Sequence, residues 1–246
     1  MYHFTSDVDW KRFFRFDKRW IENMNWARLS PAAKAVFPVI ARYCNERGES
    51  FPGETIIAAL SGLAARSARK GIHDLEGFPG FSWEYYLTKR GRQGKRFQLT
   101  FPPKGEPGRT FFFRTVIIDA GTWRKRNDGH VSGLIPAAQA LYPVLRHFAR
   151  YDDGEDERTY DDTDEFAEKY ASRHWEICSA DIGPLAKYAG ISRNTVKDAI
   201  QSLQDNFLLE AYKNDDGHKG WKVFICPPKR WRPGFMNQKL KSEAGA

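Results

Sequence analysis

Cysteine is scarce in this sequence, with only Cys44, Cys178 and Cys226 among 246 residues. An odd number of cysteines without a C-x-x-C motif argues against a disulfide framework and against a thiolate metal cage. No stretch approaches the ~18 apolar residues that a membrane span needs, and the first residues do not resemble a signal peptide. We therefore expect a cytoplasmic protein with no part in the membrane.

The usual signatures of catalysis are also missing. The segment 91–96 has the wrong spacing for a phosphate-binding G-x-x-x-x-G-K-[ST] loop, and there is no G-x-S-x-G motif. The six histidines are scattered and form no H-x-H pair that could hold a metal in a nicking enzyme. We expect no enzyme, no cofactor, no metal and no catalytic residue, although a nuclease of unrecognised type stays open at this stage.

Positive charge is plentiful but unevenly placed. The chain carries +8 overall, yet residues 152–168 hold ten acidic residues and a single arginine, Arg158, which leaves +17 on the rest. A body this basic attracts polyanions, of which nucleic acid is the most common. The acidic segment is either a solvated insertion or a cover for a basic surface.

The chain repeats itself after about 105 residues. Residues 29–40 align with residues 134–145, and the motif Phe13-Phe14-Arg15 recurs as Phe112-Phe113-Arg114. This interval is too long for a solenoid repeat, whose period is ~20–50 residues. We predict an α+β protein of two duplicated domains, residues 1–108 and 109–232, with the acidic insertion 152–168 in the second and a basic tail, residues 233–246.

The clearest local pattern in the second copy is a pair of helices over residues 181–203. Gly190 can adopt the left-handed conformation that ends a helix, and Ser192 is a good N-cap for the next one. Val196, Ala199, Ile200 and Leu203 then form one apolar stripe with helical spacing. Asn194, Lys197, Asp198 and Gln201 lie roughly opposite that stripe and are expected to face solvent.

Residues 190–203 resemble the turn and recognition helix of bacterial winged-helix DNA-binding proteins. Apolar strands at 207–212 and 221–226, separated by a polar turn, would supply the wing hairpin. The resemblance implies that Asn194, Lys197 and Gln201 read base edges, while Arg193 and Thr195 hold phosphates. The candidate DNA-binding residues of this copy are Ser192, Arg193, Asn194, Thr195, Lys197, Gln201, His218 and Lys219.

The first copy shows the same layout in a looser form. Gly62 would make the turn, and the following helix presents Arg66, Ser67, Arg69, Lys70 and His73 where the second copy has its polar face. Ala64 and Ala65 replace the capping residues, and Gly71 costs up to ~1 kcal/mol inside a helix. We therefore expect this helix to fray at its start unless DNA or a partner orders it.

The hairpin of the first copy has a strongly basic tip. Its five cations are Lys89, Arg90, Arg92, Lys95 and Arg96, whereas the tip of the second copy, residues 214–220, is nearly neutral. Such a cluster suits a phosphate clamp or a minor-groove probe. An ordinary solvated turn is the alternative.

The tandem layout resembles plasmid replication initiators, which carry two related winged-helix domains. That resemblance implies sequence-specific binding of double-stranded DNA at origin repeats, contact with host replication proteins, and repression of the protein's own gene as a homodimer in the bacterial cytoplasm. Two alternatives stay open. The protein could regulate transcription of a mobile element from an operator, or it could be an adaptor with one DNA-binding and one protein-binding repeat.

Overall fold

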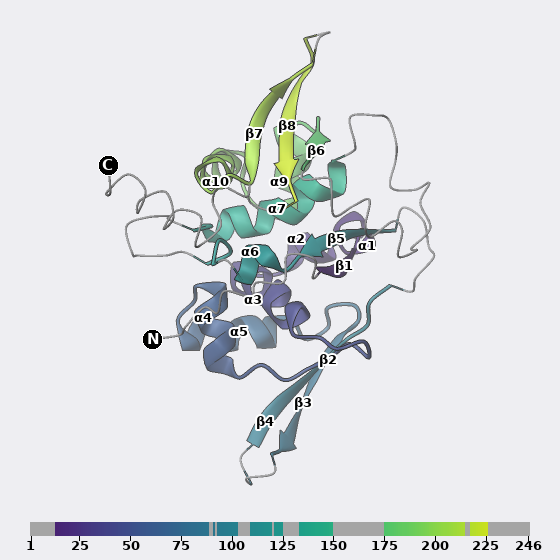
Figure 1. Cartoon of the computed structure of the whole chain (residues 1–246), viewed down its shortest axis with the longest axis vertical. Coiled ribbons are helices and arrows are strands. Elements are labelled where there is room, and N and C mark those ends of the chain that lie inside the picture. Colours follow the sequence, from purple (N-terminus) through teal and green to yellow (C-terminus); the bar gives the residue numbers. More distant parts are fainter. Residues whose placement is uncertain are drawn as a thin grey trace, which may run out of the picture.

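The computed structural model describes residues 13–88, 91, 93–102, 109–119, 121–124, 133–149, 175–214 and 217–225. The acidic insertion 152–168 and the basic tail 233–246 lie outside these residues. The described chain is a mixed helix-and-sheet protein in which a similar order of elements occurs twice (Figure 1). Within it, no helix has both the length and the apolar character needed to cross a membrane.

We refer to residues 13–102 as the first unit and to residues 109–225 as the second unit. The first unit contains β1 (Phe13–Asp17), α1 (Arg19–Glu22), α2 (Asn25–Arg28), α3 (Pro31–Arg42), β2 (Glu49–Ser50), α4 (Glu54–Ser61), α5 (Ala65–Asp74), β3 (Phe81–Leu87) and β4 (Gln93–Leu99). The second contains β5 (Thr110–Arg114), α6 (Val116–Asp119), α7 (Pro136–Phe148), β6 (Trp175–Cys178), α9 (Ile182–Ala189), α10 (Arg193–Asp205), β7 (Leu209–Lys213) and β8 (Lys219–Phe224). Each unit has one antiparallel three-stranded sheet, β2-β4-β3 or β6-β8-β7.

A further two-stranded sheet joins the units. Strands β1 and β5 carry the repeated Phe-Phe-Arg motif, and they pair with each other in antiparallel register, with Phe14 opposite Phe113. The rings of these two residues stack with centroids 4.9 Å apart. Antiparallel pairing of equivalent segments is the mark of a two-fold relation, so the two units face each other across a pseudo-two-fold axis.

Buried tryptophans repeat this relation in the centre of the molecule. The indole nitrogen of Trp26 donates to the carbonyl of Ala140, and that of Trp123 donates to the carbonyl of Ala35, both at 2.9 Å. Ala35 and Ala140 are matching positions of the repeat, on α3 and α7. These helices contact each other, and one buried apolar cluster includes residues of both units. The predicted boundary at residue 108 lies outside the described residues, and the units on its two sides share a core.

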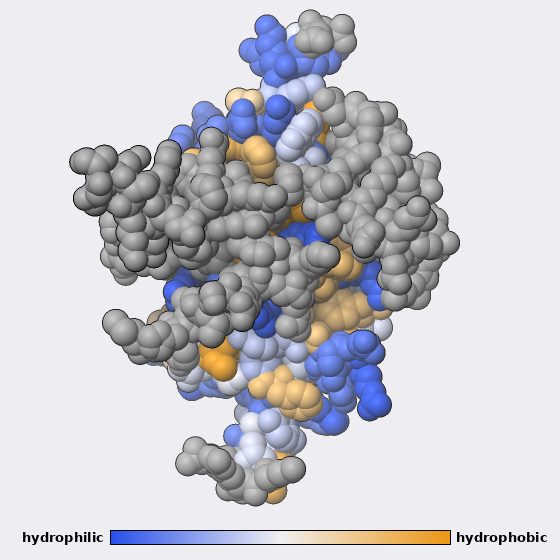
Figure 2. All heavy atoms as spheres, viewed as in Figure 1, coloured by the Kyte–Doolittle hydropathy of each residue, from blue (hydrophilic) through white to orange (hydrophobic). Residues whose placement is uncertain are grey.

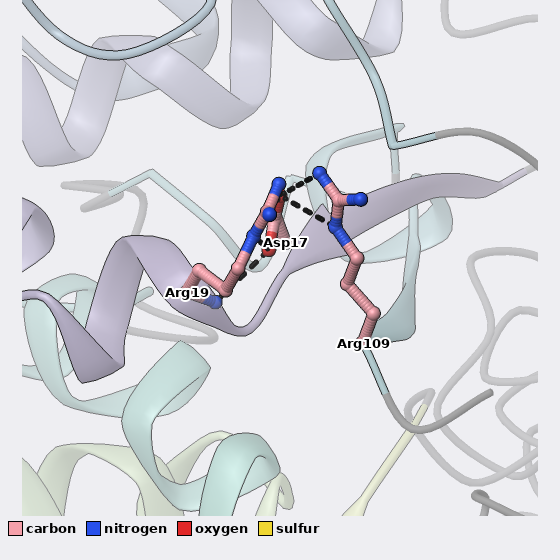
Figure 3. A network of polar contacts seen from close by, with 3 residues as sticks. All are labelled: Asp17, Arg19 and Arg109. Carbon is pink, nitrogen blue, oxygen red and sulfur yellow. Dashed lines mark hydrogen bonds and ion pairs between the residues drawn. The ribbon is translucent and has the colours of Figure 1, made fainter. Parts of the chain in front are cut away.

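Polar contacts also tie the ends of the central strands together. The buried carboxylate of Asp17, at the end of β1, lies between Arg19 and Arg109 (Figure 3). Its Oδ2 is 3.0 Å from the guanidinium of Arg19 and 3.3 Å from that of Arg109, and its Oδ1 accepts the backbone N–H of Arg19 at 2.9 Å. Because Arg109 precedes β5, this ion pair fastens the second unit to the first.

Candidate nucleic-acid interface

The helix pair predicted in the second unit is present. Helix α9 ends at Gly190, whose φ of 64° is left-handed, and α10 begins after Ser192. The Ser192 hydroxyl accepts the backbone N–H of Thr195 at 3.1 Å, which confirms the predicted cap. Val196, Ala199, Ile200 and Leu203 are all buried, so the opposite face of α10 is left for solvent.

That solvent face carries most of the candidate residues of the second unit. Arg193, Asn194 and Lys197 are exposed, and none of the three has a hydrogen-bond or ion-pair partner among the described residues. The hydroxyl of half-buried Thr195 lies 2.7 Å from that of Ser192, and Gln201 donates to Asp205 at 2.7 Å. A capped helix with unpaired amide and cationic groups can present hydrogen-bond donors to base edges and phosphates.

The first unit repeats this geometry on a helix that lacks a side-chain cap. Helix α4 ends at Gly62, with a φ of 74°, and α5 starts at Ala65 after Ala64. Gly71 has a role that its neighbours in the sequence do not predict. A Cβ at this position would lie 2.7 Å from the carbonyl oxygen of Ala32, so glycine is needed for the close approach of α5 to α3.

The candidate residues of α5 are exposed, but most of its basic side chains already have acidic partners. Arg69 Nε lies 3.1 Å from Glu54, Lys70 Nζ lies 3.0 Å from Asp74, and His73 Nδ1 lies 3.1 Å from Glu76. Ser67 is exposed as well, and so is Arg66, for which the described chain offers no such partner. The outward face of α5 is therefore richer in charge than that of α10, yet less of this charge is unpaired.

The hairpin of the first unit departs from the prediction at Lys95. Only 8% of its side chain is exposed, and its ammonium group lies 2.9 Å from Glu54 and 4.4 Å from the centre of the Trp83 ring. Lys95 thus links the hairpin to α4, in contrast to the expectation that it stands free as part of a phosphate clamp. Arg96 pairs with Glu84, and Lys89, Arg90 and Arg92 lie outside the described residues.

Glu54 is the centre of this small network. Burial raises its pKa, but hydrogen bonds and charges from Lys95 and Arg69 outweigh burial, so the pKa of Glu54 lies below its ordinary value. The carboxylate is therefore ionised at neutral pH and holds one cation from the hairpin and one from α5. Helix α5 and the hairpin of the first unit are fixed to each other through this residue.

The candidate residues in the hairpin of the second unit lie at the surface. His218 and Lys219 are both exposed. The backbone N–H of His218 donates to the Asn214 side chain at 2.7 Å, which orders the described part of the turn. Lys219 has no partner within the described part of the chain.

Two buried polar residues connect each unit to the helix pair of the other. Lys34 Nζ donates to the carbonyls of Ala189, at 2.9 Å, and Ala27, at 3.2 Å. At the matching position of the repeat, the Gln139 amide donates to the carbonyl of Ser61 at 3.2 Å. Ala189 and Ser61 are the last residues of α9 and α4, directly before the turn glycines. Each central helix therefore holds the turn of the opposite unit in place.

Neither Lys34 nor Gln139 was predicted from the sequence to have a role. The signal was present, since Lys34 and Gln139 are polar side chains at one position of an otherwise apolar repeated helix. Burial lowers the pKa of Lys34 to about 8. Its ammonium charge is compatible with this site because the C-terminal end of a helix carries partial negative charge.

The two solvent-facing helices lie on one side of the molecule. In Figure 1, α5 and α10 both lie to the left of the β1–β5 sheet, one toward each end, and the hairpins β3–β4 and β7–β8 project at opposite ends. This arrangement follows from the pseudo-two-fold relation of the units.

Comparison with known families finds a match in the first unit. The family model of a helix-turn-helix domain matches residues 27–78, which span the region from α2 to α5. No curated protein and no solved structure matches the chain. The match falls on the copy whose pattern is the looser of the two in sequence. Residues 27–78 of this chain therefore contain a helix-turn-helix domain, a type of domain that suggests DNA as a partner.

Proposed function

We propose that the protein binds double-stranded DNA in a sequence-specific way through two winged helix-turn-helix units, one in each half of the chain. The observation that carries the proposal is the second helix pair: α9, Gly190 and α10 repeat the arrangement of α4, Gly62 and α5, and the latter lies within the matched helix-turn-helix region. Each pair is followed by an antiparallel hairpin of the kind that serves as a wing.

Base reading is assigned mainly to α10. Asn194 and Lys197 offer exposed donors with no competing partner in the described chain, and Gln201 can exchange its contact with Asp205 for a base. Arg193, Thr195 and the N-terminal end of α10 are proposed to hold phosphates. In the first unit, Arg66, Ser67, Arg69, Lys70 and His73 serve the same purpose, with the hairpin cations on the adjacent backbone.

The two-fold relation sets the shape of the target. Two recognition helices on one side of a rigid body would enter successive major grooves, with half-sites ~10–10.5 bp apart. Because α3 and α7 share a core and each holds the other unit's turn, this spacing cannot adjust freely. We expect a target of two half-sites with strict spacing.

Within DNA binding, we propose the role of a non-enzymatic replication initiator of a plasmid or other mobile element. The support is the tandem layout, which resembles that of such initiators. Origin repeats, host replication proteins and a homodimeric form in the bacterial cytoplasm belong to this proposal. An operator-binding transcriptional regulator would use the same interface, and a plasmid maintenance assay with the gene deleted separates the two roles.

A second candidate is favoured by one observation. The cations of α5 are largely paired with carboxylates, as expected if the first unit binds a protein instead of DNA. In that case the molecule is an adaptor, and only α10 contacts a groove.

The test is to select duplexes from a randomised pool with the full chain and to footprint the recovered sequence with hydroxyl radicals. Two protected grooves one helical turn apart support the two-unit interface. A single protected groove supports the adaptor, and a pool that yields no enriched duplex contradicts DNA recognition.

Two matched variants then assign the contact. Lys197→Ala removes an unpaired cation from α10 and is expected to weaken binding to the selected duplex. Arg47→Ala removes an exposed cation of equal charge from the loop before β2 and serves as the control. Equal losses for the two variants would mean that α10 makes no specific contact.

A further inference from the structure

The hairpin of the first unit exposes an apolar edge that the proposed base-reading helices do not use. Leu87 is the most exposed large hydrophobic residue of the described chain, at 76%, and Tyr85 is 55% exposed. Both lie on β3 on the same face as Trp83, because alternate residues of a strand point the same way. Single exposed hydrophobic residues are common on protein surfaces, so the surroundings of Leu87 must decide whether it has a role.

The base of this hairpin is held firmly against the recognition helix. The Trp83 indole donates to Glu76 at 3.1 Å, and its ring lies 5.3 Å from that of His73 on α5. Lys95 lies over the same ring and pairs with Glu54, which also pairs with Arg69 on α5. The Tyr85 ring contacts Trp83 edge-on at 5.1 Å. Leu87 therefore sits at the end of a rigid arm with a fixed position relative to α5.

The length of the arm fits the spacing of the grooves of DNA. Leu87 is four residues beyond Trp83, which corresponds to about 13 Å along a strand. Half a helical turn of B-DNA, the distance from a major groove to the neighbouring minor groove, is roughly 17 Å. With α5 in a major groove, an arm of this length would extend over the adjacent backbone toward the minor groove.

The charge near Leu87 in the sequence indicates which kind of partner this side chain contacts. In the sequence, Leu87 and Thr88 are followed by Lys89-Arg90-Gly91-Arg92, so Leu87 lies two positions before the most basic segment of the hairpin. This concentration of charge favours a polyanion over an apolar protein surface.

The second hairpin lacks this feature. Leu87 forms the last pair of its hairpin, with Gln93, and the same position in the second hairpin is Lys213, opposite Lys219. Figure 2 shows the difference, since the projecting part of β7–β8 is blue, whereas that of β3–β4 is paler with an orange patch beside the grey tip.

We propose that Leu87 is a wedge that enters the minor groove next to the α5 site, inserts between two base pairs and bends the DNA. Apolar side chains on minor-groove-binding proteins act in this way and kink the duplex toward the major groove. Tyr85 and Trp83 stiffen the arm behind it. The proposal rests on DNA binding as proposed above and adds a deformation that the base-reading helices alone would not produce.

The test uses the full chain and the tightest duplex recovered by selection, labelled at its two ends for energy transfer. We expect the wild-type protein to bend this duplex by roughly 20–90°. Leu87→Ser should remove most of the bend, and Leu87→Met should retain it because a flexible apolar side chain remains. Lys213→Ser, at the matching position of the other hairpin, is the control and should leave the bend unchanged. Leu87 is exposed, so its variants are expected to fold, which circular dichroism checks.

The outcomes are distinguishable. A bend that is lost in Leu87→Ser and kept in Leu87→Met and Lys213→Ser supports the wedge. Tight binding of the wild-type protein without a bend, or with an equal bend in Leu87→Ser, overturns the wedge and leaves the proposed function intact. A wild-type protein that self-associates through Leu87, with Leu87→Ser monomeric and equally able to bend DNA, assigns the apolar edge to protein contact and overturns the wedge. Failure to recover any duplex overturns the proposed function and the wedge together.

Discussion

The two helix pairs of this chain share a backbone arrangement but use their charges differently. On α5, three basic side chains each have an acidic partner within 3.1 Å, whereas Arg193 and Lys197 on α10 have none in the described chain. Exposed ion pairs of this kind contribute about 0–1 kcal/mol each, so DNA can break them, but each exchange reduces the gain from a phosphate contact. The number of cations on a helix is therefore a poor measure of its affinity for DNA.

The two hairpins differ as well. That of the first unit is fixed to α5 through Trp83, Lys95 and Glu54, and β3 ends in an apolar side chain. That of the second is polar at its described end. We infer a division of labour in which the second unit reads sequence through its helix and the first contributes backbone contact and deformation through its hairpin.

The largest expected effect concerns how tightly the first unit holds the turn of the second. A Cβ at Gly190 would lie 2.0 Å from the carbonyl oxygen of Ala27, and the backbone there is left-handed. Gly190→Ala should lower the free energy of unfolding by roughly 3 kcal/mol or more. Gly77→Ala, also left-handed but with open space around the new methyl group, should lower it by only about 1 kcal/mol. Urea unfolding measures both, and equal losses would mean that the packing of α2 against the turn adds nothing.

The second prediction concerns Lys34, one of the two buried side chains that link the units. The pKa of Lys34 is lowered by burial to about 8 from 10.5, so the unfolded chain binds the proton more strongly between these pH values. Stability should therefore rise as the pH increases from about 8 to 10.5, by up to roughly 3 kcal/mol from this group. Lys34→Gln, which copies Gln139, should remove that rise. The difference between the urea unfolding curves of the two proteins over this pH range is the measurement, and parallel pH profiles would contradict the assignment.

The third prediction compares unpaired and paired cations directly. Lys197→Ala should weaken binding to the selected duplex by about 1–2 kcal/mol, and Lys70→Ala by less than about 0.5 kcal/mol, because Lys70 gives up its contact with Asp74 to reach DNA. Fluorescence anisotropy at fixed salt measures the two losses. A larger loss for Lys70→Ala would reverse the proposed division of labour.

The smallest expected effect is an increase in the salt dependence of DNA binding. Glu54→Gln should release Arg69 and Lys95 from their shared carboxylate and make the first unit more like the second. Each additional phosphate that these cations neutralise should steepen the slope of log affinity against log salt by about 0.9. Glu46→Gln, on an exposed loop residue, is the charge-matched control. If the two variants have the same salt slope, Glu54 does not restrain the cations.

Local patterns predicted the second helix pair well. The cap at Ser192, the left-handed Gly190 and the apolar stripe from Val196 to Leu203 are all present, because each depends only on residues within a few positions of one another. The repeat predicted a duplication, and the described elements of the two units follow a similar order. The DNA-contacting role of individual residues stays a prediction.

Local sequence patterns did not predict the features that depend on contacts with distant parts of the chain. From the sequence, Gly71 is a weak point of a helix, but in the structure it allows α5 to approach α3 closely. Lys95 was predicted to be a free cation, but it pairs with Glu54. The hydrogen bond that links the units through Lys34 and Ala189 was not predicted for the same reason, since these residues are 155 positions apart in the sequence. The repeat also did not predict how the two units are joined. The strands that carry the repeated motif, β1 and β5, pair with each other across the predicted boundary.

The sequence by itself determined the elements: their order, their caps, their buried faces and the basic excess of the chain. The tertiary structure decided which charges are available and how the two halves are joined. Helix caps and apolar stripes arise from short-range backbone and side-chain spacing. Ion pairs, close helix crossings and the pairing of β1 with β5 depend on distances that exist only after distant segments have packed together.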